Sequence, residues 1–347
     1  MLSIDGSLGE GGGQIVRTAI SLSAVTGIDV ELSNMRSNRP FPGLAAQHLA
    51  AVKAVALMCD ATVEGAQTGS QKLVFRPGRI KGGNHVLDVG TAGSITLVLA
   101  ACLPAALFAG GAASIEVTGG SDVRWSPPYD YFEKVFLRHL SGFGIEAHCE
   151  LERRGYYPKG GGVAVLRTGP WTKPVAPNLA RQGVFHYGGK INCSPEIPKH
   201  VPQLIRESAL ERLSQRLGVA AEIGVESCES ASPGVGITIF ASSENTVLGA
   251  SCLGEKGIPS KKVAYAAVDD LVREVESGAT ADVHAADQLI PYMALAAQKT
   301  GEPSSFISRE LTMHAQTNMA VVERFLDVGF RIEKLRGNGC RVTCFKA

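Results

Sequence analysis

Residues 6–17 read GSLGEGGGQIVR, and this stretch predicts how the fold begins. Glycines surround a single acid, Glu10, and an apolar helical segment starts at Ile15. Glycine lets backbone N–H groups approach an anion, and the start of a helix adds the positive end of its dipole. The stretch therefore indicates a phosphate site. Since Glu10 would repel phosphate, it also indicates a divalent metal between them, with a solvated glycine turn as the alternative.

One order of elements recurs three times along the chain. Each unit has a glycine-rich or acidic turn, an apolar helix, a short strand, a polar loop, a second helix and a closing strand. The units open at GEGGGQ (9–14), GTAGS (90–94) and HAADQ (284–288). The expected helices are 15–26 and 44–58, 95–108 and 129–141, and 289–298 and 319–328, and the sequence LTMHAQTN (311–318) is expected to be a loop.

The second and third units are separated by a long segment that does not follow this plan. We expect residues 183–278 to form a smaller inserted α/β domain, and residues 1–182 and 279–347 to form a catalytic domain built from the repeats. The segment carries 9 basic and 12 acidic side chains, so the positive charge of the chain lies in the repeats. The fold class is therefore α/β, built from α+β repeats.

Composition narrows the range of functions only slightly. The 34 basic and 33 acidic residues give a net charge of +1, which does not by itself indicate a nucleic-acid-binding protein. The longest apolar stretch, 97–111, is too short to span a bilayer, so we expect no membrane association. With no secretory signal visible and no CxxC among 8 cysteines, we expect a cytoplasmic protein with reduced thiols.

Polar residues of the loops are the candidates for chemistry. Arg36 and Arg39 suit the clamping of an anion, because guanidinium groups stay charged and donate in a fork; a pair of surface arginines is the alternative. Gln47 and His48 open the next helix, where a helix cap or a core histidine would also explain them. His314 is a candidate nucleophile, since imidazole is nucleophilic and largely uncharged near neutral pH.

Further candidates come from the other loops. Asp122 and Arg124 lie in the loop of the second unit, and the Asp287–Gln288 pair heads the third unit, where a helix cap is the alternative. Residues 154–162 read RGYYPKGGG. This stretch predicts either a glycine hairpin or a contact between its flanking cations, Arg154 and Lys159, and a phosphate backbone.

Taken together, these motifs resemble those of RNA 3′-terminal phosphate cyclases over nearly the whole chain. The resemblance is carried by RGYYPKGGG together with GEGGGQIVR, RPFPGLAAQHLAAVKA, GTAGS, GGSD with SPP, ADQL and HAQTNMAVVERF, in that family's order. It implies repeated α/β units, as in enolpyruvyl transferases, with a smaller inserted α/β domain.

The resemblance also implies a ligase-type reaction driven by ATP. A histidine matching His314 would take the adenylyl group of ATP and pass it to an RNA 3′-phosphate, and the 2′-OH would then displace AMP to leave a 2′,3′-cyclic phosphate. Glu10 matches a metal-binding acid, for Mg or Mn. The remaining matches are Arg17, Arg36, Arg39, Gln47 and His48 for the phosphates, and Asp287, Gln288, Pro127, Pro128 and His284 around the adenylate. His284 departs from the family, which places a tyrosine there, so adenine binding could be weaker or nucleotide preference altered.

Two alternatives stay open. One is a non-catalytic cyclase-like protein of ribosome assembly, against which His314 and Glu10 argue. The other is an enolpyruvyl transferase, which RGYYPKGGG and the inserted segment disfavour. The expected partners are ATP and RNA with a 3′-phosphate end, and a homodimer is an option that the sequence leaves open.

Overall fold

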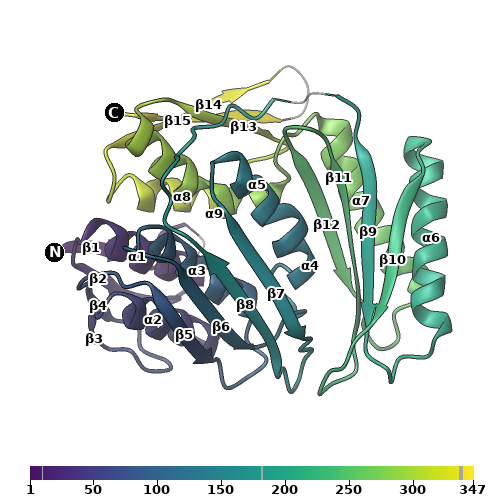
Figure 1. Ribbon diagram of the computed structural model, residues 1–347, viewed down its shortest axis with the longest axis horizontal. Coiled ribbons are helices and arrows are strands. Elements are labelled where there is room, and N and C mark those ends of the chain that lie inside the picture. Colours follow the sequence, from purple (N-terminus) through teal and green to yellow (C-terminus); the bar gives the residue numbers. More distant parts are fainter. Residues whose placement is uncertain (10, 181–182, 336–338) are drawn as a thin grey trace.

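The computed structural model of the protein describes residues 1–9, 11–180, 183–335 and 339–347. Three of the four sheets in the described residues, with their helices, follow the repeat read from the sequence, so the expected α/β class with three repeated units is confirmed. Figure 1 shows the strands β5 to β8 at the centre, with the first unit on one side and the strands β9 to β12 on the other. Among the described helices, none is both long and apolar enough to cross a bilayer.

The first unit packs two helices against a four-stranded sheet of order β1-β2-β4-β3. The pair β1 and β2 is parallel, because α1 lies between them in the chain, while β4 is antiparallel to both of its neighbours. The elements are β1 (Leu2–Asp5), α1 (Gly13–Thr26), β2 (Val30–Ser33), α2 (Ala46–Met58), β3 (Thr62–Glu64) and β4 (Leu73–Arg76).

The second unit repeats this topology strand for strand. Its order is β5-β6-β8-β7, again with a parallel first pair and two antiparallel pairs. The expected second helix is helical from 129 to 142, with a wider π turn in its middle. The elements are β5 (Gly83–Asp88), α3 (Ile95–Leu107), β6 (Ala113–Gly119), α4 (Tyr129–Tyr131), η1 (Phe132–Phe136), α5 (Leu137–Gly142), β7 (Ala147–Arg153) and β8 (Gly162–Thr168).

The third unit has three named strands, in the order β13-β15-β14. The place of its first strand is taken by residues before the 183–278 segment. Asn178 forms a parallel bridge with Ser305, and the N–H of Leu179 donates to the carbonyl of Ser305 at 2.8 Å. The segment therefore interrupts the third unit between its first strand and first helix. The elements are α8 (Val283–Thr300), β13 (Ser304–Ser308), α9 (Met313–Val322), β14 (Val328–Lys334) and β15 (Cys340–Lys346).

Both helices of the third unit begin earlier than expected. The sequences HAADQ and MHAQTN lie inside the first turns of α8 and α9, so the prediction that 311–318 is a loop was wrong. Asp282 and Thr312 cap the two helices, each accepting backbone N–H bonds with its side chain. Polar residues occur at these helix starts because the first backbone N–H groups of a helix have no partner within the helix and are bonded by polar side chains.

The interrupting segment has a buried cluster of its own, which includes Ile191, Val268 and Leu271. Its sheet has the order β10-β9-β11-β12, and α6 and α7 pack on each other. The proposed boundary at Gln182 lies outside the described residues. The elements are β9 (His186–Cys193), α6 (His200–Leu217), β10 (Ala221–Ser227), β11 (Val235–Ser242), β12 (Val247–Leu253) and α7 (Ser260–Ser277). We propose that this segment is an inserted domain.

Helices of the three units share one core. α1 packs against α2, α3 and α9, and nearly every residue of α3 is buried. Small residues in α3, such as Ala101 and Ala105, let neighbouring helices approach closely. This packing brings the first turns of α1, α2 and α9 together. The eight cysteines are free thiols, and Cys340 and Cys344 share the buried face of β15, as expected.

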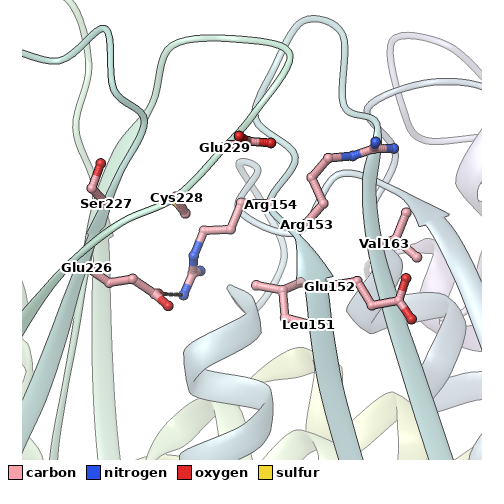
Figure 2. Close-up of a pocket in the computed structure, with 9 residues that line it drawn as sticks. All are labelled: Leu151, Glu152, Arg153, Arg154, Val163, Glu226, Ser227, Cys228 and Glu229. Carbon is pink, nitrogen blue, oxygen red and sulfur yellow. Dashed lines mark hydrogen bonds and ion pairs between the residues drawn. The ribbon is translucent and has the colours of Figure 1, made fainter.

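The stretch RGYYPKGGG (154–162) joins the second unit to the interrupting segment through hydrogen bonds and ion pairs. Arg154 is only 1% exposed, and its guanidinium donates to Asp122 and Asp130, which are both buried. It also donates to Glu226 of β10, as Figure 2 shows. The hydroxyl of Tyr156 donates to Asn192 of β9 at 2.6 Å. The expectation that Arg154 contacts a phosphate backbone is therefore wrong, because its donors are occupied by buried carboxylates.

Replacing Arg154 should destabilise the protein strongly. The substitution Arg154→Met removes the guanidinium between the buried carboxylates of Asp122 and Asp130 and leaves Lys190, 3.5 Å from Asp130, as the remaining cation. The expected cost is about 3–5 kcal/mol in the free energy of unfolding. Denaturant titration measures this loss. Arg167→Met is the matched control, since Arg167 pairs with Glu150 at the surface and its loss should cost less than about 1 kcal/mol. Equal losses in the two variants would contradict the assignment.

Candidate active site

The glycine run gathers side chains from two other segments around the start of α1. A Cβ added at Gly12 would lie 3.5 Å from Nη2 of Arg39 and 3.5 Å from Cε1 of His314. At Gly9 an added Cβ would collide with Oγ1 of Thr317. The run thus lies directly against the arginine loop of the first unit and against α9 of the third, as expected for a composite site.

The N-terminus of α1 is open to a ligand. Gly12 occupies its cap position and offers no side chain to the first backbone N–H groups, and the first turn carries no acid. These groups and the helix dipole favour an anion. Together with Arg39 and His314, which lie beside them, the backbone N–H groups of this first turn are suited to bind a phosphate group.

A hydrogen-bonded frame holds His314. It is the second residue of α9, whose cap Thr312 accepts the N–H of Ala315 at 3.0 Å and donates its own hydroxyl to Asp287 of α8. The side chain of Asn318, one turn further on, donates to the carbonyl of Asp287 at 2.9 Å.

The same Asn318 ties this frame to the glycine run. Its Oδ1 accepts the hydroxyl of Thr18 of α1 at 2.7 Å, in the buried interior. The helix that carries His314 is thereby joined to α8 on one side and to α1 on the other. Sequence reasoning missed these contacts. Thr312 carried a signal, as a cap residue directly before a helix, and Asn318 was a candidate as a polar residue of the third unit, whereas nothing in the sequence singled out Thr18.

His48 lies buried at the start of α2, where an added Cβ at Gly13 would be 1.9 Å from its Nε2. Its Nδ1 accepts the N–H of Ala45 at 3.2 Å, which leaves the proton of the neutral ring on Nε2, facing the start of α1. Burial, together with the charges of Arg17 and Arg36, lowers the pKa of His48 to about 3. His48 is therefore a neutral ring whose Nε2–H can donate, and its predicted role at the phosphates stays a prediction.

Three arginines approach the same place. Burial lowers the pKa of Arg17 to about 10, which still leaves it charged at neutral pH. Arg36 has a left-handed backbone, with φ of 54°, and donates to the carbonyl of Gly43 at 2.6 Å; burial and then the charge of Arg39 lower its pKa. Like charges crowded in this way favour an anion between them.

Gln47 connects this cluster to the second unit. Its Oε1 accepts the N–H of Ser94, the cap residue of α3, at 3.3 Å. Two residues on, the hydroxyl of Thr96 donates to the carbonyl of Pro127 at 2.7 Å, and Pro128 caps α4. The predicted adenine-binding prolines are thus linked to the first unit through the start of α3.

The other predicted residues of the adenylate site lie on the first turns of α8. His284 is exposed, and its ring meets that of Tyr131 edge-on, with the centroids 6.5 Å apart. Gln288 donates its side-chain amide to the carbonyl of His284 at 3.1 Å. Tyr131 follows Pro128 by three residues, so the loop of the prolines and the start of α8 meet here.

Not every candidate joins this group. Asp122 belongs to the buried cluster around Arg154, and Arg124 pairs with Glu255 of the interrupting segment. The predicted metal ligand Glu10 lies outside the described residues. In the ranges that the structure describes, no cluster of three or more histidine, cysteine or acidic side chains could hold a metal ion.

A hollow of about 530 Å³ lies elsewhere, between the second unit and β10. Figure 2 shows Arg154 reaching Glu226 across it while Arg153 points away. Apart from Arg154, whose donors are occupied by carboxylates, none of the predicted ATP- or RNA-binding residues lines it. The residues at the helix starts are therefore separate from this hollow.

The fold and the site define a class: three helix-on-sheet repeats, one of them interrupted, with an anion-binding helix start beside a histidine. A family model described as "RTC: RNA 3'-terminal phosphate cyclase" matches residues 8–332. A protein of Methanosarcina mazei is 43% identical over 97% of this chain and 98% of its own length. Proteins of Pyrococcus furiosus and Nitrosospira multiformis are each 43% identical over 96% of this chain and over 95% and 93% of their own lengths. All three are named RNA 3'-terminal phosphate cyclase, and the chain belongs to this family.

The cap at Thr312 should stabilise the frame around His314. The substitution Thr312→Val removes both the cap and the bond to Asp287, which should lower the free energy of unfolding by about 1–2 kcal/mol. Thr312→Ser keeps both groups and should remain close to the wild type in the same denaturant titration. A serine variant as unstable as the valine variant would argue against the cap.

His48 should make the protein sensitive to acid. Because its folded pKa of about 3 lies below the ordinary histidine value of 6.5, only the unfolded chain binds a proton between these values, and stability falls as the pH falls. The slope from this group approaches about 1.4 kcal/mol per pH unit. His48→Asn retains an acceptor but cannot titrate, so it should flatten the loss of unfolding free energy between about pH 6 and about pH 4. An unchanged slope would contradict the buried neutral state.

Proposed function

We propose that the protein converts the 3′-terminal phosphate of RNA to a 2′,3′-cyclic phosphate at the expense of ATP, as a ligase-type nucleotidyl-transfer enzyme. The observation that carries this is the meeting of His314, Arg39 and the open start of α1 at Gly12. A nucleophile, a cation and a backbone anion site at one point suit transfer of a phosphorus group. The proposed substrate, an RNA 3′-terminal phosphate, is inferred from the family and from the names of the relatives.

In the first step a ring nitrogen of His314 attacks the α-phosphorus of ATP. The bond from that phosphorus to the bridging oxygen breaks, pyrophosphate leaves, and a histidine-linked adenylate remains. The start of α1 and Arg39 would stabilise the charge that builds on the phosphate oxygens. The hydrogen-bonded frame of Thr312 and Asn318 supports this role, since it fixes α9 and so orients the imidazole.

In the second step an oxygen of the RNA 3′-phosphate attacks the adenylate phosphorus and the P–N bond breaks. The product is an RNA-(3′)pp(5′)A anhydride. Its 3′-phosphorus now carries AMP as the leaving group, in place of an oxide, which is a poor leaving group. The neighbouring 2′-OH then attacks the 3′-phosphorus, loses its proton and displaces AMP. Arg17 and Arg36 are suited to hold the RNA phosphate during both displacements.

We assign the adenylate to the surface between the first turns of α8 and the loop that contains Pro127 and Pro128. Pro127, Pro128 and His284 would pack on adenine, with Asp287 and Gln288 beside them. The exposed imidazole of His284 can stack on a base, although it offers a smaller face than tyrosine.

A divalent metal, Mg or Mn, belongs to the proposal only through Glu10. The described residues provide no metal cluster, so such an ion would depend on Glu10 and on the phosphates of the substrates, and would neutralise their charge. No step above is assigned to it. A cytoplasmic location and a homodimer likewise remain proposals from the sequence.

Labelled ATP tests the proposal directly. With ATP labelled at the α-phosphate and a divalent metal, the protein should acquire a label that is labile in acid and stable in alkali, as a phosphoramidate is. His314→Ala should abolish it by removing the nucleophile. His200→Ala is the matched control, because His200 is exposed at the start of α6 and should leave labelling unchanged.

The alternatives give different results in the same experiment. A non-catalytic assembly protein would acquire no label, and an enolpyruvyl transferase would turn over phosphoenolpyruvate instead. Undiminished label in His314→Ala would exclude His314 as the nucleophile.

A further inference from the structure

The loop of Arg36 and Arg39 displays an apolar ring that the proposed chemistry does not use. Phe41 is 83% exposed, although it is one of the larger apolar side chains of the chain. It lies between Pro40 and Pro42, which are exposed as well. The ring therefore contributes nothing to the buried core of the first unit and is accessible to a ligand that binds at this loop.

The loop that carries Phe41 is closed and braced. The N–H of Gly43 donates to the carbonyl of Met35 at 2.9 Å, and the guanidinium of Arg36 also bonds to Gly43. The N–H of Arg39 donates to the carbonyl of Arg36 at 3.0 Å, and the flanking prolines fix φ on both sides of Phe41. A ring held on such a loop loses little conformational entropy when it binds.

The ring lies close in the chain to the arginine of the proposed phosphate position. Only Pro40 separates Phe41 from Arg39, so their Cα atoms are at most about 7 Å apart. The guanidinium of Arg39 lies against Gly12 beside His314, where the RNA 3′-phosphate must arrive. The base of the same terminal nucleotide is one sugar away from that phosphate, so it comes within reach of the ring.

We propose that Phe41 stacks on the nucleobase of the 3′-terminal nucleotide of the RNA. This rests on the proposed function and names a further binding residue for it. Charge and apolar surface match the two ends of that nucleotide, since Arg36 and Arg39 face its phosphate and Phe41 faces its base. Every base has a π face, so such a contact accepts any terminal base, and it favours RNA over a free phosphate ion.

The contact predicts a specific pattern of binding affinities. The substitution Phe41→Ala should weaken binding of a short RNA with a 3′-phosphate by about 5- to 150-fold. It should leave unchanged the binding of the same oligonucleotide whose last nucleotide lacks its base, because the partner of the ring is then already gone. Phe41→Tyr should restore binding, and Tyr157→Ala, which removes another exposed aromatic ring, should have no effect on either ligand.

Binding by fluorescence anisotropy gives the affinities, and the RNA-independent labelling of His314 with ATP is measured on each variant. Equal loss for the intact and the abasic RNA, or no loss for either, would overturn the stacking contact. Normal labelling in Phe41→Ala with weakened RNA binding would support it. Failure of the wild type to label at all would instead count against the proposed function, so the two failures are distinguishable.

Discussion

Gly13 has no side chain, and the arrangement of the site depends on this. The imidazole of His48 occupies the space that a Cβ at Gly13 would need, whereas Arg39 and His314 lie at ordinary contact distance from Gly12. A side chain at Gly13 would displace His48 from the start of α1. The start of α2 can therefore approach the start of α1 this closely because the first helix begins without a side chain at Gly13.

The interior then holds this arrangement in place. The helices α1, α2, α3 and α9 meet in one apolar core, and two polar bonds cross it at Asn318, to Thr18 and to Asp287. Buried polar bonds cost free energy if they are left unmade, so they select one register of α9 against α1. Apolar packing supplies most of the stability, and these two bonds determine where His314 points.

The sequence predicted the repeat, the class of fold and most helices, because apolar periodicity and glycine turns are local signals. It misplaced the starts of α8 and α9, since caps and loops use the same polar residues, as Asp282 and Thr312 illustrate. It identified His314, Arg39 and the glycine run separately, and only the packing of distant helices brings them into contact. Arg154 was misread, because its charge resembles a phosphate ligand in sequence, whereas two buried carboxylates are its partners only in space.

The third unit shows how a large segment can interrupt a repeat without disturbing the site. The chain leaves for this segment just after Asn178, which pairs with Ser305, and returns at Thr280, whose N–H donates to Ile307. Both attachment points are thus on β13, two residues apart. When the ends of a connection are already fixed side by side, lengthening it adds only a slowly growing entropy of closure. The length and composition of this connection could therefore vary widely among chains of this architecture while the helix starts around His314 stay where they are.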